Sequence, residues 1–508
     1  MHDLKKYKEY GYGQYHLQIL NRRLYLMLLQ KDIPEKIHKK GGIRRWVVLV
    51  AIIAAQLMVT IDISGLNVAL PSIQRTLHFN ELNLQWVISA YQIIFGSFLL
   101  LGGKIADLWG RKNMFLVGTT LFTLTSLLCG LAWSDISLIV FRALQGLAAA
   151  LLTPTSLSLV LNIFVEERDR NLALGIWGAI FGAGGAFGSV LSGVVTTVWD
   201  WTWFFFLNVP LGIFAIMIGI RLIPKDRIDL KSKKINIFSS FTISTSIMLL
   251  LYSITIAQRN GWTTTSTIAY LSVSILLLAF FVLFERRSAS PLLPLFVVRK
   301  RTMRAGIIIG VLAGSYHFSL FFLLTLYMQD VLHLSPLQTS IGYLASAINT
   351  VVFANITPKL IRRSGVKLVL ICGQALVITS FVYYARLPVE GNYWIDLFPA
   401  LFIGGIGWGL IFPSINILSF SSLEKSVTGI ASGIINMSEQ LGGAIGIALI
   451  AIIAVTQTKS FVDSHPGSTL YSPDALTSGF HFGYWVLAGL AMISLCYTAL
   501  FSTSKGNK

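Results

Sequence analysis

The sequence contains few charged residues. Only 12% of its 508 residues are Asp, Glu, Lys or Arg, about half of the roughly 25% typical of soluble domains. A chain with so few charges cannot cover a surface that faces water. Its apolar runs are typically about 20 residues long, which lets a helix cross a hydrocarbon core of roughly 30 Å. The composition therefore excludes an ordinary soluble protein and predicts an integral membrane protein made of helices.

Cysteine is also scarce. Cys129, Cys372 and Cys496 all lie in apolar runs and have no close spacing, so we expect neither a disulfide framework nor a metal site. The sequence shows no nucleotide-binding loop, metal-ligand cluster or hydrolase signature, so we expect neither enzyme activity nor a cofactor. The first apolar run, which begins near Trp46, is too long for a cleavable signal peptide, and a basic tail precedes it.

The apolar runs predict fourteen membrane-spanning helices, and the basic residues support this count. With a cytoplasmic N-terminus, about 35 of the 40 Lys and Arg residues fall on the cytoplasmic side, as the positive-inside rule requires. The net charge of +18 then reflects topology in a cell membrane, with both termini cytoplasmic, and does not indicate nucleic-acid binding. The predicted spans are 46–68, 84–103, 114–133, 136–162, 172–195, 204–223, 237–257, 267–284, 305–328, 339–357, 366–384, 397–417, 428–455 and 482–501.

A short basic hinge occurs twice. "GGKIADLWGRK" ends at Lys112 and "TPKLIRRSGVK" ends at Lys367, and each has a Lys followed by Gly six positions on and by Lys eight positions on. Each hinge lies between the second and third span of a set of six if two central spans are set aside. Two related bundles are typical of transporters that rock about a central site.

We therefore predict an all-α membrane protein with two six-helix pseudo-repeat bundles and two inserted helices. The tail either forms a surface helix on the membrane or is a solvated arm. The predicted divisions are a basic cytoplasmic tail (1–45), an amino-terminal bundle (46–224), a cytoplasmic linker with two extra helices (225–303), a carboxy-terminal bundle (304–502) and a cytoplasmic tail (503–508).

Few ionisable residues fall deep inside the predicted spans. A charge at the bilayer centre costs roughly 3 kcal/mol on insertion scales, so such residues indicate function or a specific partner. Asp62 in the first span and Arg142 in the fourth lie at similar depth, and we predict a direct or water-mediated contact between them. The pair is either a switch linked to protons or substrate, or a static brace between two helices.

Glu439 lies near mid-membrane in the thirteenth span without a basic residue at comparable depth. It is either a group that exchanges a proton or meets a cationic substrate, or a neutral acid hydrogen-bonded by Gln440 or Asn436. His317 is either a titrating group or a packing residue. The polar residues that we expect to line a cavity are Tyr91, Gln92, Gln145, His317 and Asn436.

Several stretches resemble the major facilitator superfamily, and in particular its drug:proton antiporters with fourteen helices. They are "LMVTIDISGLNVALPSIQ", "WVISAYQI", "GGKIADLWGRK", "FRALQGLAAALLTP", "WTWFFFLNVPLG", "YMQDVLHLSPLQTSIGYL" and "GIASGIINMSEQLGGAIGIALI". The resemblance implies a proton-relay and helix-bracing role for Arg142. It also implies that the first hinge is a conformational switch, with its switch residues at Gly103, Asp107, Gly110, Arg111 and Lys112.

The fifth span departs from the pattern of these antiporters. They carry a Gly-Pro followed by a Gly-Gly pair, but this chain reads "GGAFGSVLSGVV", with Ser189 in the place of the proline. That signature is associated with export. Because it is altered here, we retain a second interpretation of the function, which is given below. The small residues still permit close helix packing, which we expect at Gly184, Gly188, Ser189 and Gly193.

These features favour a proton-coupled exporter of amphipathic or lipophilic compounds, cationic ones above all, that works by alternating access as a monomer. Its partners would be a small-molecule substrate, protons and the lipid bilayer. The alternative is a translocator of a lipid or metabolite that has the same fold and is not strictly coupled to protons. A membrane enzyme or sensor is the third interpretation, and no clustered His/Asp pair at a membrane face supports it.

Overall fold

The computed structural model describes residues 42–164, 166–224, 237–288, 295–423 and 428–500. Within these ranges every regular element is a helix, as predicted. Residues 1–41 of the predicted N-terminal tail, and with them the predicted surface helix, lie outside the described residues. Residues 42–45, which were assigned to the tail, belong instead to the first described helix. Gly42–Val48 belong to a separate unit from residues 49 onward, and the packing described below concerns the second unit.

The helices follow the order of the predicted spans. They are α2 (Gly42–Leu77), α3 (Glu81–Leu84), α4 (Trp86–Trp109), α5 (Arg111–Gly130), α6 (Asp135–Ile163), α7 (Glu167–Val198), α8 (Trp201–Phe206), α9 (Asn208–Leu222), α10 (Ile237–Asn260), α11 (Thr265–Arg287), α12 (Leu295–Val298), α13 (Arg301–Leu326), η2 (Tyr327–Val331), α14 (Pro336–Ser364), α15 (Val366–Tyr384), η3 (Tyr393–Leu397), α16 (Phe398–Phe420), α17 (Thr428–Ser464) and α18 (Pro473–Leu500).

Eleven helices in the described part of the chain are long and apolar enough to cross a membrane. The other three predicted spans coincide with α4, α7 and α10, which hold shorter apolar stretches. The count of fourteen crossings therefore stays a prediction. The predicted bounds were too short for α17 and α18, whose helices continue beyond the apolar core. The sixth span is divided at Leu207 into α8 and α9.

Glycines bring the amino-terminal helices close together. α4 packs on α6, and α6 also packs on α5. A Cβ added at Gly146 would lie 2.4 Å from the carbonyl oxygen of Tyr91, and one at Gly102 would lie 2.1 Å from that of Ala150. These separations exclude any larger side chain, so the backbones of α4 and α6 are in direct contact. This is the packing that small residues permit between membrane helices.

The carboxy-terminal helices have a seam of the same kind between α13 and α17. Added Cβ atoms at Gly314 and Gly442 would lie 2.0 Å and 2.1 Å from carbonyl oxygens of the facing helix, and one at Gly446 would lie 2.4 Å from that of Ser315. Gly442 and Gly446, which belong to the stretch "LGGAIG", therefore permit close packing of the two helices.

The amino- and carboxy-terminal helices meet through α4 with α17 and through α7 with α14. Gln329 donates to the carbonyl of Val68 over 2.8 Å, and Ser340 donates to that of Ser189 over 2.7 Å. Both contacts lie at the end of the bundle opposite to the hinge glycine Gly110. The structure is therefore held together across this end.

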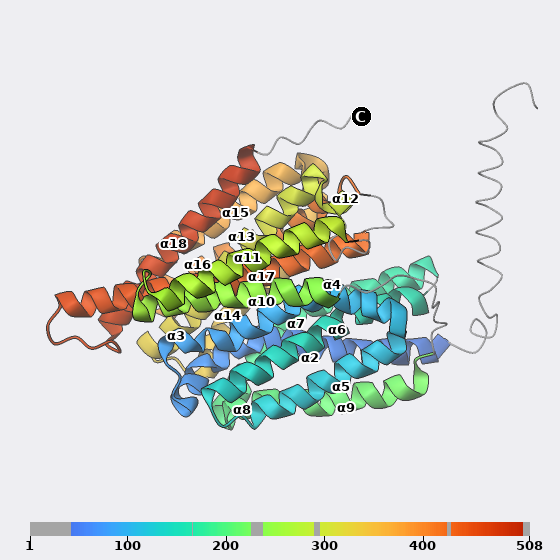
Figure 1. Cartoon of the computed structure of the whole chain (residues 1–508), viewed down its shortest axis with the longest axis horizontal. Coiled ribbons are helices and arrows are strands. Elements are labelled where there is room, and N and C mark those ends of the chain that lie inside the picture. The colour runs from blue at the N-terminus through green and yellow to red at the C-terminus, as the bar shows by residue number, and fades with distance from the viewer. Residues whose placement is uncertain (1–41, 165, 225–236, 289–294, 424–427, 501–508) are drawn as a thin grey trace, which may run out of the picture. The chain divides into compact units, whose positions relative to one another are not determined.

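The two inserted helices form a hairpin. Ser246 and Ser274 each donate to the other's carbonyl over 2.9 Å, and Ser239 donates to Glu285 over 2.8 Å. These bonds join α10 to α11, and α10 packs against both α4 and α17 (Figure 1). The hairpin thus contacts both sets of helices at one of the places where they meet.

Candidate transport site

Asp62 and Arg142 form a buried ion pair. Asp62 on α2 is fully buried and Arg142 on α6 is 1% exposed, and Arg142 Nη1 lies 2.5 Å from Asp62 Oδ2. Arg142 Nε donates to the carbonyl of Val87 over 3.0 Å. The predicted contact between the two side chains is confirmed, and it is direct.

Gln145 completes this ion pair. Its Nε2 donates to the second carboxylate oxygen of Asp62 over 3.1 Å and to Ser126 Oγ over 2.7 Å, while its Oε1 accepts from Arg142 over 2.6 Å. Asn208, the first residue of α9, also donates to Ser126 over 3.1 Å. Side chains of α2, α5, α6 and α9 are thereby joined in one polar network inside an apolar bundle. A buried ion pair needs such additional hydrogen bonds to repay the loss of hydration.

Tyr91 on α4 forms one wall of the network. The guanidinium carbon of Arg142 lies 4.3 Å from the centroid of the Tyr91 ring, where a cation–π interaction is favourable. The Tyr91 hydroxyl is buried and has no hydrogen-bond partner. The Tyr91 ring therefore contacts the guanidinium group, and the Tyr91 hydroxyl can still form a hydrogen bond with another group.

Gln92, the next residue of α4, lies at the contact with α17. It is 1% exposed, and neither atom of its amide has a hydrogen-bond partner. A Cβ added at Gly443 would lie 3.1 Å from Gln92 Oε1. Because unpaired buried amides are rare, Gln92 stands out as a polar group between the two sets of helices.

Glu439 lies apart from this network, on α17. It is partly exposed and makes no hydrogen bond or ion pair with any described residue. Asn436 donates to Ser432 on its own helix, and Gln440 Oε1 has no partner. The expected alternative, in which Gln440 or Asn436 bonds Glu439 across helices, is therefore wrong for this conformation.

His317 on α13 is enclosed by aromatic rings. The centroid of its imidazole lies 4.3 Å from that of Trp408 and 5.1 Å from those of Phe321 and Phe412. Its Nδ1 is buried without a partner. This arrangement supports the interpretation of His317 as a packing residue more than as a titrating group.

In each hinge a single glycine separates two helices. Gly110 separates α4 from α5 with φ +90°, and Gly365 separates α14 from α15 with φ +81°, a region that other L-residues avoid. Lys112 Nζ donates to the carbonyls of Ile220 and Ile223 over 2.8 and 2.7 Å. Lys367 Nζ donates to the carbonyl of Ala499 over 2.6 Å.

The other predicted switch residues occupy the same region. Gly103 faces Pro154 at 3.6 Å from an added Cβ, and Arg111 is partly buried and has an interaction partner. The side chain of Asp107 lies outside the described residues. Its predicted role at the helix ends stays a prediction.

The small residues of α7 pack against two different helices. A Cβ at Gly188 would lie 2.3 Å from Ser64 Oγ on α2, and one at Gly193 would lie 2.1 Å from Ser340 Oγ on α14. Ser189 is in contact with both, because its hydroxyl donates to the Ser64 carbonyl over 3.4 Å and its carbonyl accepts from Ser340. The surroundings of Gly184 lie outside the described residues. Close packing is therefore present at three of the four predicted positions.

Sequence reasoning missed Ser126 and Asn208, although both are polar residues in apolar runs. The aromatic run Trp199–Phe206 has an exposed face and a buried face. Trp199 and Trp203 are exposed, but Trp201, Phe204 and Phe205 are buried. Side chains on one face of a helix recur every three to four residues. This period was the sequence signal that could have separated the exposed residues from the buried ones.

Apolar helices that enclose a buried Asp–Arg pair are typical of a multi-pass membrane transporter. Comparison with known proteins identifies its family. The model of the Major Facilitator Superfamily matches residues 52–447, and the chain belongs to this family. It is a transporter and not an enzyme.

Relatives and solved structures agree with this assignment. The chain is 33% identical to the puromycin resistance protein pur8 of Streptomyces alboniger, over 90% of this chain and 91% of that protein. It is 32% identical to the cephamycin export protein CmcT of Amycolatopsis lactamdurans, over 89% and 91%. The crystal structure of an auto-inhibited peptide transporter of the POT family matches with a TM-score of 0.66 at 13% identity, over 92% of this chain and 98% of that one, and supports the fold alone.

Proposed function

We propose that the protein is a proton-coupled exporter of amphipathic compounds, mainly lipophilic cations, that works by alternating access in the cell membrane. The buried ion pair of Asp62 and Arg142 is the observation that carries the proposal. A membrane protein keeps a charged pair in its interior at a cost, and replacing such a pair by apolar residues often costs nothing. The pair therefore favours a functional role over a purely structural one.

Glu439 is the second acid of the proposed cycle. It has no partner ion among the described residues, and its exposure leaves it reachable. A carboxylate in this situation is suited to exchange a proton or to bind a cationic cargo. Its position on α17, next to the seam with α13, lets a shift of either helix change its surroundings.

The domain division belongs to the same proposal. We take α2–α9 and α13–α18 as the two bundles that rock, with α10 and α11 inserted between them. The matching hinges support this, because in each a lysine two residues after the glycine binds the end of the last helix of its own set. With basic loops at the cytoplasmic face, both termini are cytoplasmic, and one chain contains the whole site.

The drive would come from the proton gradient. One proton that moves down 100 mV supplies about 2.3 kcal/mol, and each pH unit adds about 1.4 kcal/mol. Cargo enters from the cytoplasm or inner leaflet, the bundles rock, an external proton binds Asp62 or Glu439, cargo leaves, and the proton is released inside. The names of the relatives, a puromycin resistance protein and a cephamycin export protein, support drug efflux as the physiological role.

Transport by proteoliposomes tests this proposal. Ethidium should move against its own gradient when a pH gradient is imposed, and an uncoupler should abolish the movement. Transport that persists unchanged after the uncoupler would favour the alternative, a lipid or metabolite translocator. The alternative is included in the test because the export signature of the fifth span is altered at Ser189.

A further inference from the structure

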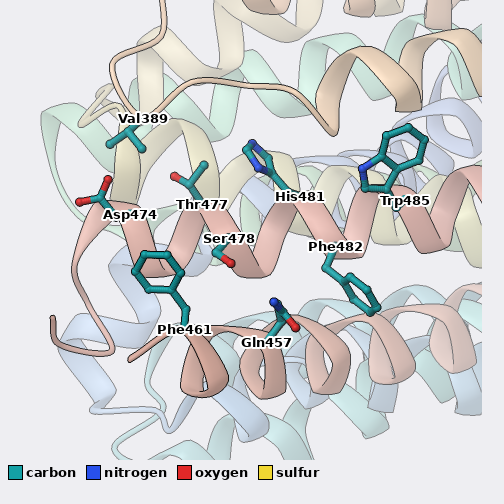
Figure 2. A pocket seen from close by; sticks show the side chains of 9 residues that line it. All are labelled: Val389, Gln457, Phe461, Asp474, Thr477, Ser478, His481, Phe482 and Trp485. Carbon is teal, nitrogen blue, oxygen red and sulfur yellow. The ribbon is translucent and has the colours of Figure 1, made fainter. Parts of the chain in front are cut away.

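A shallow cavity that is open to the surface lies between α17 and α18, at the end of the bundle opposite to the hinge glycines. Its volume is about 450 Å³. None of its lining residues belongs to the network around Asp62, and none was predicted from the sequence. Figure 2 shows them along one side of α18, with the end of α17 and the segment after α15 beside it: Val389, Gln457, Phe461, Asp474, Thr477, Ser478, His481, Phe482 and Trp485.

The polarity of the lining changes along α18. Asp474, Ser478 and His481 come first, and Phe482 and Trp485 follow. Phe482 is 49% exposed and Trp485 is 47% exposed, as expected of aromatic side chains at a membrane interface. The predicted fourteenth span begins at Phe482, so the polar part of the cavity lies outside the apolar core and the aromatic part inside it. This gradient suits an amphipathic molecule that lies across the boundary.

Two polar side chains of the cavity indicate that it binds a ligand. Thr477 is 3% exposed, and its hydroxyl has no hydrogen-bond partner, which is uncommon for a buried group. His481 Nε2 lies 2.6 Å from the carbonyl oxygen of Leu387. A carbonyl can only accept, so Nε2 carries the proton and donates. This bond fixes the ring, and its Nδ1 has no hydrogen-bond partner among the described residues.

Charge selects the kind of ligand. Asp474 is the one carboxylate among the lining residues, and neither lysine nor arginine lines the cavity. A cation is attracted both by this carboxylate and by the face of an aromatic ring such as that of Phe461. We propose that this cavity binds an organic ammonium group that carries an apolar tail, with the ammonium near Asp474 and the tail beside Phe482 and Trp485.

Two sources have this chemistry. One is a cationic compound on its way out of the protein, and the other is a membrane lipid with an ammonium headgroup. The site is separate from Asp62 and Glu439, so it does not depend on proton coupling. Failure of the exporter proposal would leave the site in place, and loss of the site would leave the exporter proposal intact.

Photoaffinity labelling tests the site. The full chain is placed in nanodiscs of phosphatidylglycerol and exposed to a dodecyl-trimethylammonium probe that carries a diazirine in its tail. We expect labelled peptides from residues 457–461 and 474–485. Asp474→Asn and Thr477→Val should each reduce this labelling about twofold to fivefold, the range set by one exposed ionic contact or one hydrogen bond. A matched dodecanol probe without charge should label these peptides weakly and equally in all variants.

Asp463→Asn is the matched control, because Asp463 is an exposed acid of α17 that does not line the cavity. Its labelling should equal that of the unaltered chain, and so should its melting temperature and those of the two test variants. Competition by added phosphatidylethanolamine identifies a lipid as the occupant, and competition by tetraphenylphosphonium identifies cargo. Equal labelling in Asp474→Asn, equal labelling by the uncharged probe, or competition by neither compound would overturn the proposal.

Discussion

Gln145 binds the oxygen of Asp62 that Arg142 leaves free. Arg142 occupies Oδ2 and Gln145 Nε2 occupies Oδ1, while Gln145 Oε1 accepts from Arg142. The three side chains form a closed ring in which each is bonded to the other two. Protonation of Asp62 would remove the charge that Arg142 pairs with, and would therefore weaken the contact that these side chains make between α2 and α6. The ring links the charge state of Asp62 to helix movement.

Removing one member of the ion pair should destabilise the protein. We expect Asp62→Asn to cost about 3 kcal/mol, because it leaves the Arg142 charge buried without its counterion. The double variant Asp62→Asn/Arg142→Gln should lose less than the sum of the two single variants. Thermal unfolding in detergent measures all three. Additive losses in the double variant would show that the pair contributes no coupling energy.

Lys112 should stabilise the end of α9. Lys112→Met retains the aliphatic stem but removes the ammonium group that binds two carbonyls. We expect a loss of about 1 kcal/mol, since a cation at a helix C-terminus contributes about that much, and a smaller loss for Lys367→Met, which removes one such bond. The measurement is the shift in melting temperature. Lys459→Met is the control, because Lys459 is exposed and has no partner among the described residues.

Close packing between α2 and α7 should depend on Gly188. Gly188→Ala places a methyl group 2.3 Å from Ser64 Oγ and 2.7 Å from Ile61 Cα, so the helices must separate. Overpacking of this kind costs about 1–3 kcal/mol, which should appear as a lower melting temperature. Gly489→Ala on α18 meets nothing within 4 Å and should melt like the unaltered chain. Equal melting of the two variants would contradict the described packing.

Gly193 should control the closure of the end opposite to the hinges. Its added Cβ would lie 2.1 Å from Ser340 Oγ, so Gly193→Ala disfavours the contact between α7 and α14 that joins the two sets of helices. Leu337 donates its backbone N–H to Thr197 Oγ1 over 3.1 Å at this contact. In a chain without its three native cysteines, a cysteine at Thr197 should therefore react faster with a water-soluble thiol reagent when Gly193 is alanine. An unchanged rate would show that this contact does not close the end.

Much of the fold could be predicted from composition and helix period. Few charges and long apolar runs are enough to identify membrane helices, and the repeated hinge marks equivalent positions around Gly110 and Gly365. The bounds of α17 and α18 could not be predicted, because polar residues such as Gln457 and Asp474 continue a helix beyond the apolar core. The burial of Trp201 likewise depends on which helix lies opposite, and no local pattern specifies this.

The candidate site was partly predictable for a similar reason. Asp62 and Arg142 could be paired from their depth alone, because the position of a residue along a membrane-spanning helix sets its depth in the membrane. Depth does not specify the direction in which a side chain points around the helix axis. It therefore could not predict the contacts of Ser126 and Asn208, or that Gln145 closes the ring. The cavity between α17 and α18 depends on the packing of two helix ends and left no motif.

Proton release on cargo binding tests the central claim most directly. Ethidium is added to the purified protein in weakly buffered detergent solution, and a pH-indicator dye reports the protons released. The account predicts release by the unaltered chain, less release by Asp62→Asn and by Glu439→Gln, and none by the double variant. If the double variant released as many protons as the unaltered chain, these two acids would not be the groups that couple protons to transport.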